Sequence, residues 1–219
     1  MGVRAKICGI NSRAALDAAI AGGAAFVGLN FYAPSPRSLA VAAAAELAAA
    51  TPIGIGKVGL FVDEPDERLA EVLAALPLDM LQLHGGETPE RVAAIRRRFG
   101  LPVMKAVKVS VAGDVAQAEA YIGVADWLLF DAKPPKDMTG ALPGGNAIAF
   151  DWTLLAGRAW PMPWMLSGGL TPENLAEAVR ITGARVVDVS SGVEDQPGAK
   201  SPAKIAAFLA EAARAVSSA

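Results

Sequence analysis

The feature that most constrains the fold of this chain is a regular alternation of short apolar segments and alanine-rich amphipathic segments. Apolar runs recur eight times, and about 23 residues separate most of their starts, close to the minimum for a strand, a crossover helix and two loops. These runs predict strands at residues 4–8, 25–31, 57–62, 80–84, 103–107, 127–131, 164–167 and 186–190. Apolar residues at helical spacing predict helices at 12–21, 41–50, 66–76, 89–99, 172–181 and 202–216.

Strands that alternate with helices imply a parallel sheet. The runs are apolar on both faces, as in Val27-Gly28-Leu29, which is typical of strands covered by helices outside and packed side chains inside. An open doubly wound sheet is the alternative, but it usually has a glycine-rich phosphate loop after its first strand. Here that place holds Cys8-Gly9-Ile10-Asn11. We therefore expect residues 1–219 to form a single α/β domain, a (β/α)8 TIM barrel.

The charge and the cysteine content exclude several kinds of partner. The chain has 20 basic and 22 acidic residues mixed along its length, so a surface of one sign for nucleic acid or an anionic membrane is not expected. No apolar run reaches the roughly 18 residues of a membrane span, and the first residues do not form a signal peptide. The single cysteine, Cys8, forms neither an internal disulfide nor a metal site by itself. We expect a cytoplasmic protein.

Polar side chains close several of the predicted strands, where barrels of this class have their active sites. Each has a simpler interpretation when taken alone. A cysteine such as Cys8 is often an inert small residue of the core, and a histidine such as His84 is often a hydrogen-bonded structural residue. Asp131 is also suited to capping a turn, and Arg37 to being a solvated loop charge. In a barrel, however, these groups converge on one rim, so we single out Cys8, Arg37, Gln82, His84, Asp131, Ser167, Asp188, Ser190 and Ser191.

Two turns that contain glycine predict a phosphate site. Gly168 and Gly169 follow the seventh predicted strand, while Ser191 and Gly192 follow the eighth. Glycine lets the backbone approach an anion, and amides near the start of a helix point toward it. Although such glycines also occur in ordinary tight turns, a phosphate site at these two loops is a recurring feature of barrels. We expect a phosphate at these four residues.

An acid, a potential thiolate, an arginine and a phosphate site on one rim suit acid–base isomerisation of a small sugar phosphate. The sequence has no cluster with metal-ligand spacing and no dinucleotide fingerprint. Lys6 and Lys105 lie within predicted strands, so a Schiff-base mechanism stays open. A non-catalytic barrel that binds a sugar phosphate as a sensor is a further alternative. The presence of both Cys8 and Asp131 argues against it, since binding alone needs neither a base nor a proton donor.

Seven motifs in order along the chain resemble those of the phosphoribosylanthranilate isomerase family. They are Lys6-Ile7-Cys8-Gly9-Ile10, Ser35-Pro36-Arg37, Leu81-Gln82-Leu83-His84-Gly85, Phe130-Asp131-Ala132-Lys133, Phe150-Asp151-Trp152, Leu166-Ser167-Gly168-Gly169-Leu170 and Asp188-Val189-Ser190-Ser191-Gly192-Val193. Indole-3-glycerol-phosphate synthase and the histidine-pathway isomerases would require a catalytic lysine or a pair of aspartates instead. Two positions depart from the family, because Asn11 replaces a threonine and Ala147 a glycine. The second departure puts the contribution of the sixth loop to phosphate binding in doubt.

The resemblance implies an aldose–ketose isomerase of tryptophan biosynthesis, without a cofactor or metal, that acts on phosphoribosylanthranilate. By analogy, Asp131 is the general acid that opens the furanose ring, and Cys8 is the general base that removes a proton from the adjacent carbon. Nearby positive charge or peptide dipoles are expected to lower the pKa of the Cys8 thiol. Arg37 is expected to bind the anthranilate carboxylate through two parallel hydrogen bonds, with His84 and Asp188 in supporting roles. The chain is expected to be a monomer or a homodimer.

Overall fold

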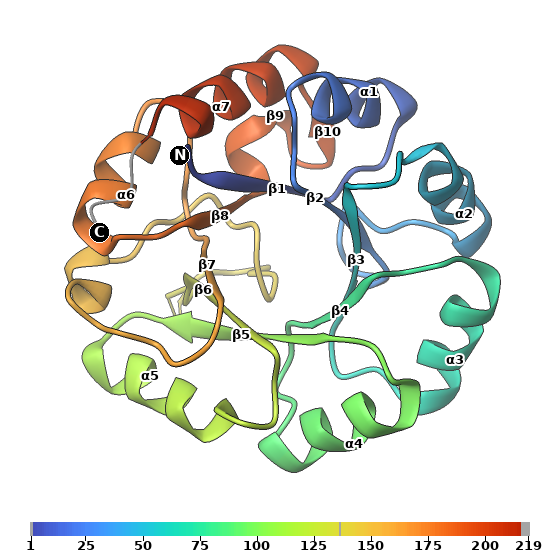
Figure 1. Cartoon of the computed structure of the whole chain (residues 1–219), viewed down its shortest axis with the longest axis horizontal. Helices are drawn as coiled ribbons and strands as arrows, with labels where there is room; N and C mark the ends of the chain where they lie inside the picture. Colours follow the sequence, from blue (N-terminus) through green and yellow to red (C-terminus); the bar gives the residue numbers. More distant parts are fainter. Residues whose placement is uncertain (1, 136, 216–219) are drawn as a thin grey trace.

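The computed structural model describes residues 2–135 and 137–215, and its centre is a closed barrel of eight parallel strands surrounded by helices (Figure 1). Neighbouring strands pair in sequence order, and β8 pairs with β1 to close the barrel. The predicted barrel is confirmed, and the open-sheet alternative is wrong. The strands are β1 (Arg4–Cys8), β2 (Phe26–Asn30), β3 (Gly56–Phe61), β4 (Met80–Leu83), β5 (Val103–Val109), β6 (Trp127–Ala132), β7 (Trp164–Leu166) and β8 (Val186–Val189).

Helices connect the strands and cover the outside of the barrel (Figure 1). The side-chain oxygens of Ser12 and Thr88 accept hydrogen bonds from the first free amides of α1 and α4, which fixes where these helices begin. The last helix ends at Arg214, and residue 216 of the prediction lies outside the described residues. The helices are α1 (Arg13–Ala21), α2 (Val41–Ala50), α3 (Asp66–Ala75), α4 (Pro89–Phe99), α5 (Ala112–Ala116), α6 (Leu175–Thr182) and α7 (Pro202–Arg214).

Three connections differ from the regular pattern. After β5 the crossover is short and consists of α5 and the 3-10 turn η1 (Gln117–Tyr121). After β6 the chain runs through an irregular segment before the 3-10 turn η2 (Trp152–Leu155), as its proline and glycine content predicts. After β8 come η3 (Ser191–Val193) and a small antiparallel pair that the sequence pattern did not predict, β9 (Glu194–Gln196) and β10 (Ala199–Lys200).

The interior of the barrel is apolar at one end and polar at the other. A cluster of buried apolar residues near the starts of the strands consists of Phe26, Val58, Met80, Met104, Ala106, Leu129, Met165 and Val186. The buried ionisable residues Lys6, Asp131 and Asp188 lie further along their strands. The apolar cluster therefore leaves the carboxyl ends of the strands as the place for polar chemistry.

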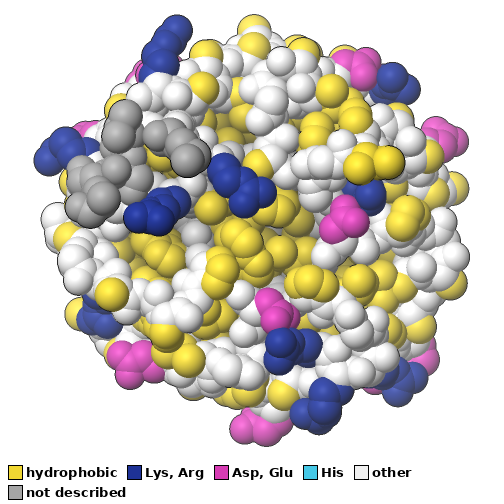
Figure 2. Space-filling view, in the orientation of Figure 1, with side chains coloured by type: hydrophobic (Ala, Val, Ile, Leu, Met, Phe, Trp, Pro, Cys, Tyr) yellow, Lys and Arg dark blue, Asp and Glu magenta, His cyan; other side chains and the backbone are white. Residues whose placement is uncertain are grey.

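The outer surface has no dominant charge on the face drawn in Figure 2, where Lys and Arg side chains are scattered among Asp and Glu around the rim. Hydrophobic side chains occupy the middle of that face. Of the helices in the described residues, none has the length and hydropathy of a membrane span.

Candidate active site

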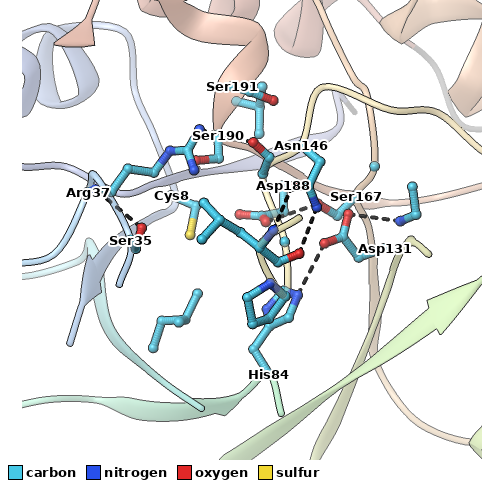
Figure 3. Close-up of a pocket in the computed structure, with 18 of the residues that line it drawn as sticks. Cys8, Ser35, Arg37, His84, Asp131, Asn146, Ser167, Asp188, Ser190 and Ser191 are labelled. Carbon is cyan, nitrogen blue, oxygen red and sulfur yellow. Dashed lines mark hydrogen bonds and ion pairs between the residues drawn. The ribbon is translucent and has the colours of Figure 1, made fainter. Parts of the chain in front are cut away.

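One pocket at the carboxyl ends of the strands gathers nearly all of the predicted site residues (Figure 3). Parallel strands end on the same side of a barrel, so residues far apart in the sequence meet there. Two residues of the predicted set, Gln82 and Gly192, are absent from the described residues that line the pocket. Gly192 lies in the 3-10 turn after β8. A Cβ at this position would overlap the backbone oxygen of Leu170, so the glycine serves packing. The predicted residues that line the pocket are Cys8, Arg37, His84, Asp131, Ser167, Gly168, Gly169, Asp188, Ser190 and Ser191.

Asp131, near the end of β6, is buried and lies beside His84, which points toward it in Figure 3. Its Oδ2 is 3.1 Å from His84 Nε2, and its Oδ1 accepts a hydrogen bond of 2.9 Å from the backbone amide of Ala132. The other ring nitrogen of His84, Nδ1, is 2.8 Å from Nε2 of Gln82. The carboxyl group therefore ends a chain of hydrogen bonds that starts at β4.

Cys8, at the end of β1, lies among charged groups. Lys6 Nζ donates a hydrogen bond of 2.9 Å to Asp188 Oδ1, and both side chains are buried. Burial raises the pKa of the Cys8 thiol, and Asp188 adds to this effect, while Lys6 and Lys200 act in the opposite direction. The predicted lowering of this pKa is therefore wrong, because burial outweighs the two ammonium groups.

Neither strand lysine is among the described residues that line the pocket. Burial opposes the charge on Lys6, yet Asp188 and Cys8 raise the pKa of its ammonium group above the ordinary value, so this amine is protonated. Burial lowers the pKa of Lys105, but its Nζ is 2.6 Å from Glu87 Oε2 and donates to the backbone oxygen of Gly85 at 2.8 Å. A protonated or enclosed amine does not form an imine, so the geometry does not favour the Schiff-base alternative.

Arg37, which follows β2, is bound by a carboxylate that sequence analysis missed. Its Nε and Nη2 donate parallel hydrogen bonds of 2.7 and 2.8 Å to the two oxygens of Glu194. Nη2 also donates to the backbone oxygen of Gly145 at 3.1 Å. Although burial acts against it, hydrogen bonds from Arg37 and the charge of Lys200 lower the pKa of Glu194. The two parallel bonds expected for a ligand are thus made to Glu194, and Nη1 makes no hydrogen bond within residues 2–135 and 137–215.

Glu194 and Lys200 belong to the small β9–β10 pair, where they also bind each other, with Nζ 2.7 Å from Glu194 Oε1. Glu194 directly follows the motif that ends at Val193, but the motif does not show which group this carboxylate binds. Its role depends on the contact with Arg37, which lies 157 positions earlier in the chain. The local sequence therefore marks the position of Glu194 but not its partner.

The turns after β7 and β8 have features of an anion site. Gly168 and Gly169 have φ values of +86° and +65°, in the left-handed region that favours glycine. Their backbone amides donate no hydrogen bond to any part of the chain that the structure describes. The turn is held by Asn174, whose side chain binds the amide of Thr171 at 2.8 Å and the oxygen of Gly169 at 2.9 Å. As a result α6 begins at Leu175, three residues later than the predicted start at residue 172.

The irregular segment after β6 covers the pocket, and residues 142–148 are part of its lining. A Cβ at Gly144 would be 2.7 Å from both Asp131 Oδ2 and His84 Nε2, so only glycine permits this approach. A Cβ at Gly145 would be 2.5 Å from Arg37 Nη1. Ala147 has a φ of +57°, the left-handed region in which an alanine is strained. Its backbone conformation thus gives a physical reason for a glycine at this position.

The arrangement places a buried carboxyl group and the only thiol of the chain across one pocket, beside an arginine and two turns suited to an anion (Figure 3). Among the described residues, no three His, Cys, Asp or Glu side chains are grouped in a way that suits a metal ion. These groups can donate a proton, remove a proton and bind two negatively charged ends of one small molecule.

Comparison with known proteins gives consistent matches over nearly the whole chain. The model of the family described as N-(5'phosphoribosyl)anthranilate (PRA) isomerase matches residues 5–211. The N-(5'-phosphoribosyl)anthranilate isomerase of Rhodospirillum centenum is 63% identical over 213 residues, which are 97% of this chain and 99% of that protein.

Solved structures agree with these sequence matches. The phosphoribosyl anthranilate isomerase of Thermotoga maritima superposes with a TM-score of 0.84 at 36% identity, over 96% of this chain and 98% of that one. Another structure of such an isomerase, in complex with reduced 1-(o-carboxyphenylamino)-1-deoxyribulose 5-phosphate, has a TM-score of 0.81 at 33% identity, with the same coverage. The chain belongs to the N-(5'-phosphoribosyl)anthranilate isomerase family.

Proposed function

We propose that Asp131 and Cys8 carry out the reaction of this family in the pocket described above, as general acid and general base. Membership of the family makes the chain an isomerase of tryptophan biosynthesis. The reaction is the Amadori rearrangement of N-(5'-phosphoribosyl)anthranilate to 1-(2-carboxyphenylamino)-1-deoxyribulose 5-phosphate. The observation that supports these roles is the placement of a buried carboxyl group and the only thiol on either side of one pocket.

The first step opens the sugar ring. Protonated Asp131 gives its proton to the furanose ring oxygen, and the bond between this oxygen and carbon 1 breaks. The lone pair of the anilino nitrogen forms a C=N bond to carbon 1, which produces an iminium ion and leaves Asp131 ionised. The apolar strand before Asp131 and its burial provide surroundings in which a carboxylic acid can act as a donor.

The second step removes a proton from carbon 2. The Cys8 thiolate takes this proton, and the electron pair of the C–H bond forms a C=C bond between carbons 1 and 2 while the iminium nitrogen becomes neutral. The resulting enolamine then tautomerises, because the hydroxyl on carbon 2 loses its proton and carbon 1 gains one, which gives the ketone. Lys6 and Lys200 favour the thiolate that this step requires.

Arg37 is our candidate for binding the anthranilate carboxylate. Its Nη1 is the nitrogen left available after Glu194 and Gly145 have taken the other donors. Because the backbone at Gly145 lies against Nη1, the proposal requires this part of the segment to move when the ligand enters. A single charge-assisted hydrogen bond then replaces the two that the sequence suggested.

The phosphate is assigned to the turns after β7 and β8. The available amides of Gly168 and Gly169 and the side chain of Ser191 supply donors without any charged residue. His84 supports Asp131, and Asp188 supports Lys6, so both act through a neighbour in this proposal. The amide of Gly192 remains part of the predicted phosphate site, although its position is also explained by packing.

We further propose that residues 1–219 form one domain that works without a cofactor or metal, in the cytoplasm, as a monomer or a homodimer. The two assembly states differ in mass by a factor of two, so light scattering of the purified protein distinguishes them. Neither nucleic acid nor a membrane is expected as a partner.

The test of the proposed function is an assay of purified protein with freshly generated phosphoribosylanthranilate, in which the loss of anthranilate fluorescence is followed. We expect turnover that needs no added metal and survives a chelator. The variants Cys8→Ala and Asp131→Asn serve as matched controls, because each removes one proton-transfer group and keeps the pocket. An unchanged fluorescence with the wild-type protein would contradict the proposal.

A further inference from the structure

Gln82 is a fully buried amide whose two polar atoms have different surroundings. Its Nε2 is 2.8 Å from His84 Nδ1, whereas its Oε1 has no hydrogen-bond partner among the described residues. Buried amide oxygens almost always have a partner, so an unpaired one next to a site calls for an explanation. Gln82 is not among the described residues that line the pocket, so any effect on the reaction has to pass through His84.

The orientation assigned to the amide implies where the protons of the His84 ring lie. Nε2 of Gln82 can only donate, so His84 Nδ1 accepts and has no proton of its own. The ring proton is then on His84 Nε2 and points at Asp131 Oδ2, 3.1 Å away. Since Asp131 Oδ1 accepts from the amide of Ala132, both carboxylate oxygens act as acceptors. This is the arrangement of an ionised Asp131, the state that follows proton donation.

A half-turn of the Gln82 amide gives the other state. Oε1 then faces His84 Nδ1, and because a carbonyl oxygen can only accept, Nδ1 must have a proton. A second proton still lies between His84 Nε2 and Asp131 Oδ2. His84 and Asp131 together therefore hold two protons instead of one. A general acid needs this second proton before it donates. The half-turn gives Oε1 the partner that it lacks in the structure and takes that partner from Nε2, so the two orientations each satisfy one end of the amide.

We propose that Gln82 is a positioning residue that sets, through the orientation of its amide, how many protons His84 and Asp131 share. When the amide oxygen of Gln82 faces His84, Asp131 is ready to donate a proton. When the amide nitrogen faces His84, Asp131 has already donated it. The inference rests on the proposed role of Asp131 as the general acid. It extends that role to a residue that does not contact the ligand.

Three cationic groups around the pair have partners elsewhere. Lys105 on the neighbouring β5 binds Glu87, Lys6 binds Asp188, and Arg37 binds Glu194. Within residues 2–135 and 137–215, no ionisable side chain besides these two forms a hydrogen bond with His84 or Asp131. The groups on the strands and loops packed around the pair are Lys6, Cys8, Arg37, Lys57, Asp63, Glu87, Lys105, Lys108, Lys133, Asp188 and Glu194.

The first test uses the unaltered protein. His84 is the only histidine of the chain, so the ring ¹⁵N signals of tag-free protein labelled with [¹⁵N]histidine report this side chain without assignment. We expect Nδ1 to be protonated below the alkaline limb of the kcat/KM–pH profile and unprotonated above it, with the change at the pH of that limb. If the protonation state of Nδ1 did not change across the alkaline limb, the proposal would be overturned.

The second test uses two variants of similar length. In Gln82→Glu the carboxylate only accepts, which keeps Nδ1 protonated, so the alkaline limb should move up by about one pH unit or more. In Gln82→Met neither hydrogen bond is possible, and we expect kcat to fall about tenfold with KM within about threefold and without that upward shift. The same shift in both variants, or none in a folded Gln82→Glu protein, would reject the proposal.

The two hypotheses remain separable. If Asp131→Asn keeps a normal kcat, the acid role of Asp131 is wrong, whatever the state of His84. If Asp131→Asn loses turnover but the protonation of His84 Nδ1 does not follow the pH profile of the wild-type protein, only the role of Gln82 is wrong.

Discussion

The two sides of the pocket hold the two groups proposed for catalysis by different means. On the side of β4 and β6, Asp131 is bound by His84 and a backbone amide, without a fixed charge as a hydrogen-bond partner. On the side of β1 and β8, Cys8 lies near the buried ion pair of Lys6 and Asp188. The proposed acid, which would regain a proton in every cycle, is thus placed in a chain of hydrogen bonds through His84 and Gln82. The thiol is placed in a fixed field that decides how easily it ionises.

The largest effect is expected from a substitution on the side of β4 and β6. Asp131→Asn removes the proton donor and keeps its shape, so kcat should fall by at least about 10²-fold while the affinity for product stays within a few-fold. Stopped-flow turnover and a product-binding titration on the same sample measure the two quantities. A kcat close to that of the wild type would mean that the acid lies elsewhere.

A smaller effect is expected at Arg37, which tests whether the charged side also binds the carboxylate of the ligand. Arg37→Ala should weaken binding of anthranilate-bearing ligands by roughly 1.5–3 kcal/mol, the usual contribution of a charge-assisted hydrogen bond. Calorimetry with the product measures this loss, and ribose 5-phosphate is the control ligand. An equal loss for ribose 5-phosphate would move Arg37 to the phosphate site.

The fixed field around Cys8 can be changed in both directions. Because burial raises the pKa of this thiol above its ordinary value of 9.0, alkylation by iodoacetamide should keep accelerating above that pH. Lys6→Met removes a positive charge and should slow alkylation at a given pH by roughly tenfold, whereas Asp188→Asn should accelerate it. Mass spectrometry gives the extent of labelling, and the activity of the same sample shows whether it falls in step. Equal rates in the two variants would argue against an electrostatic control of Cys8.

The smallest effect concerns the segment after β6, which contacts both sides of the pocket. Ala147→Gly should relieve the strain of a left-handed alanine and raise the free energy of unfolding by about 0.5–1 kcal/mol. Urea unfolding measures the change. Ala149→Gly is the control, because residue 149 is not among the described residues with a positive φ, and there a glycine should leave stability unchanged or lower it. A stabilisation of similar size at both positions would remove strain as the explanation.

Most of the barrel could be predicted from the sequence, because buried strands and amphipathic helices have distinct hydrophobic periods. The errors fall where local contacts override the pattern. α6 begins at Leu175 instead of residue 172, since the Asn174 side chain holds the preceding turn. The β9–β10 pair has strands of only three and two residues, which are too short to show a period.

The candidate site could be predicted as a set of residues but not as a set of bonds. Cys8, His84 and Asp131 line the pocket as expected, because the ends of parallel strands meet at one rim. The predicted pair of hydrogen bonds from Arg37 to a ligand goes to Glu194, and the predicted lowering of the pKa of Cys8 is reversed by burial. Both errors concern quantities that depend on neighbours in space.

By itself the sequence determined the barrel, the end of the barrel that carries the site, and the residue types available there. These follow from periodicity and strand order, which are local properties of the chain. Only the tertiary structure decided which charges are paired, such as Lys6 with Asp188 across 182 positions and Arg37 with Glu194 across 157. It also decided the balance of burial and charge at Cys8. The physical reason is that Coulomb energies and desolvation depend on distances through space, which no local pattern encodes.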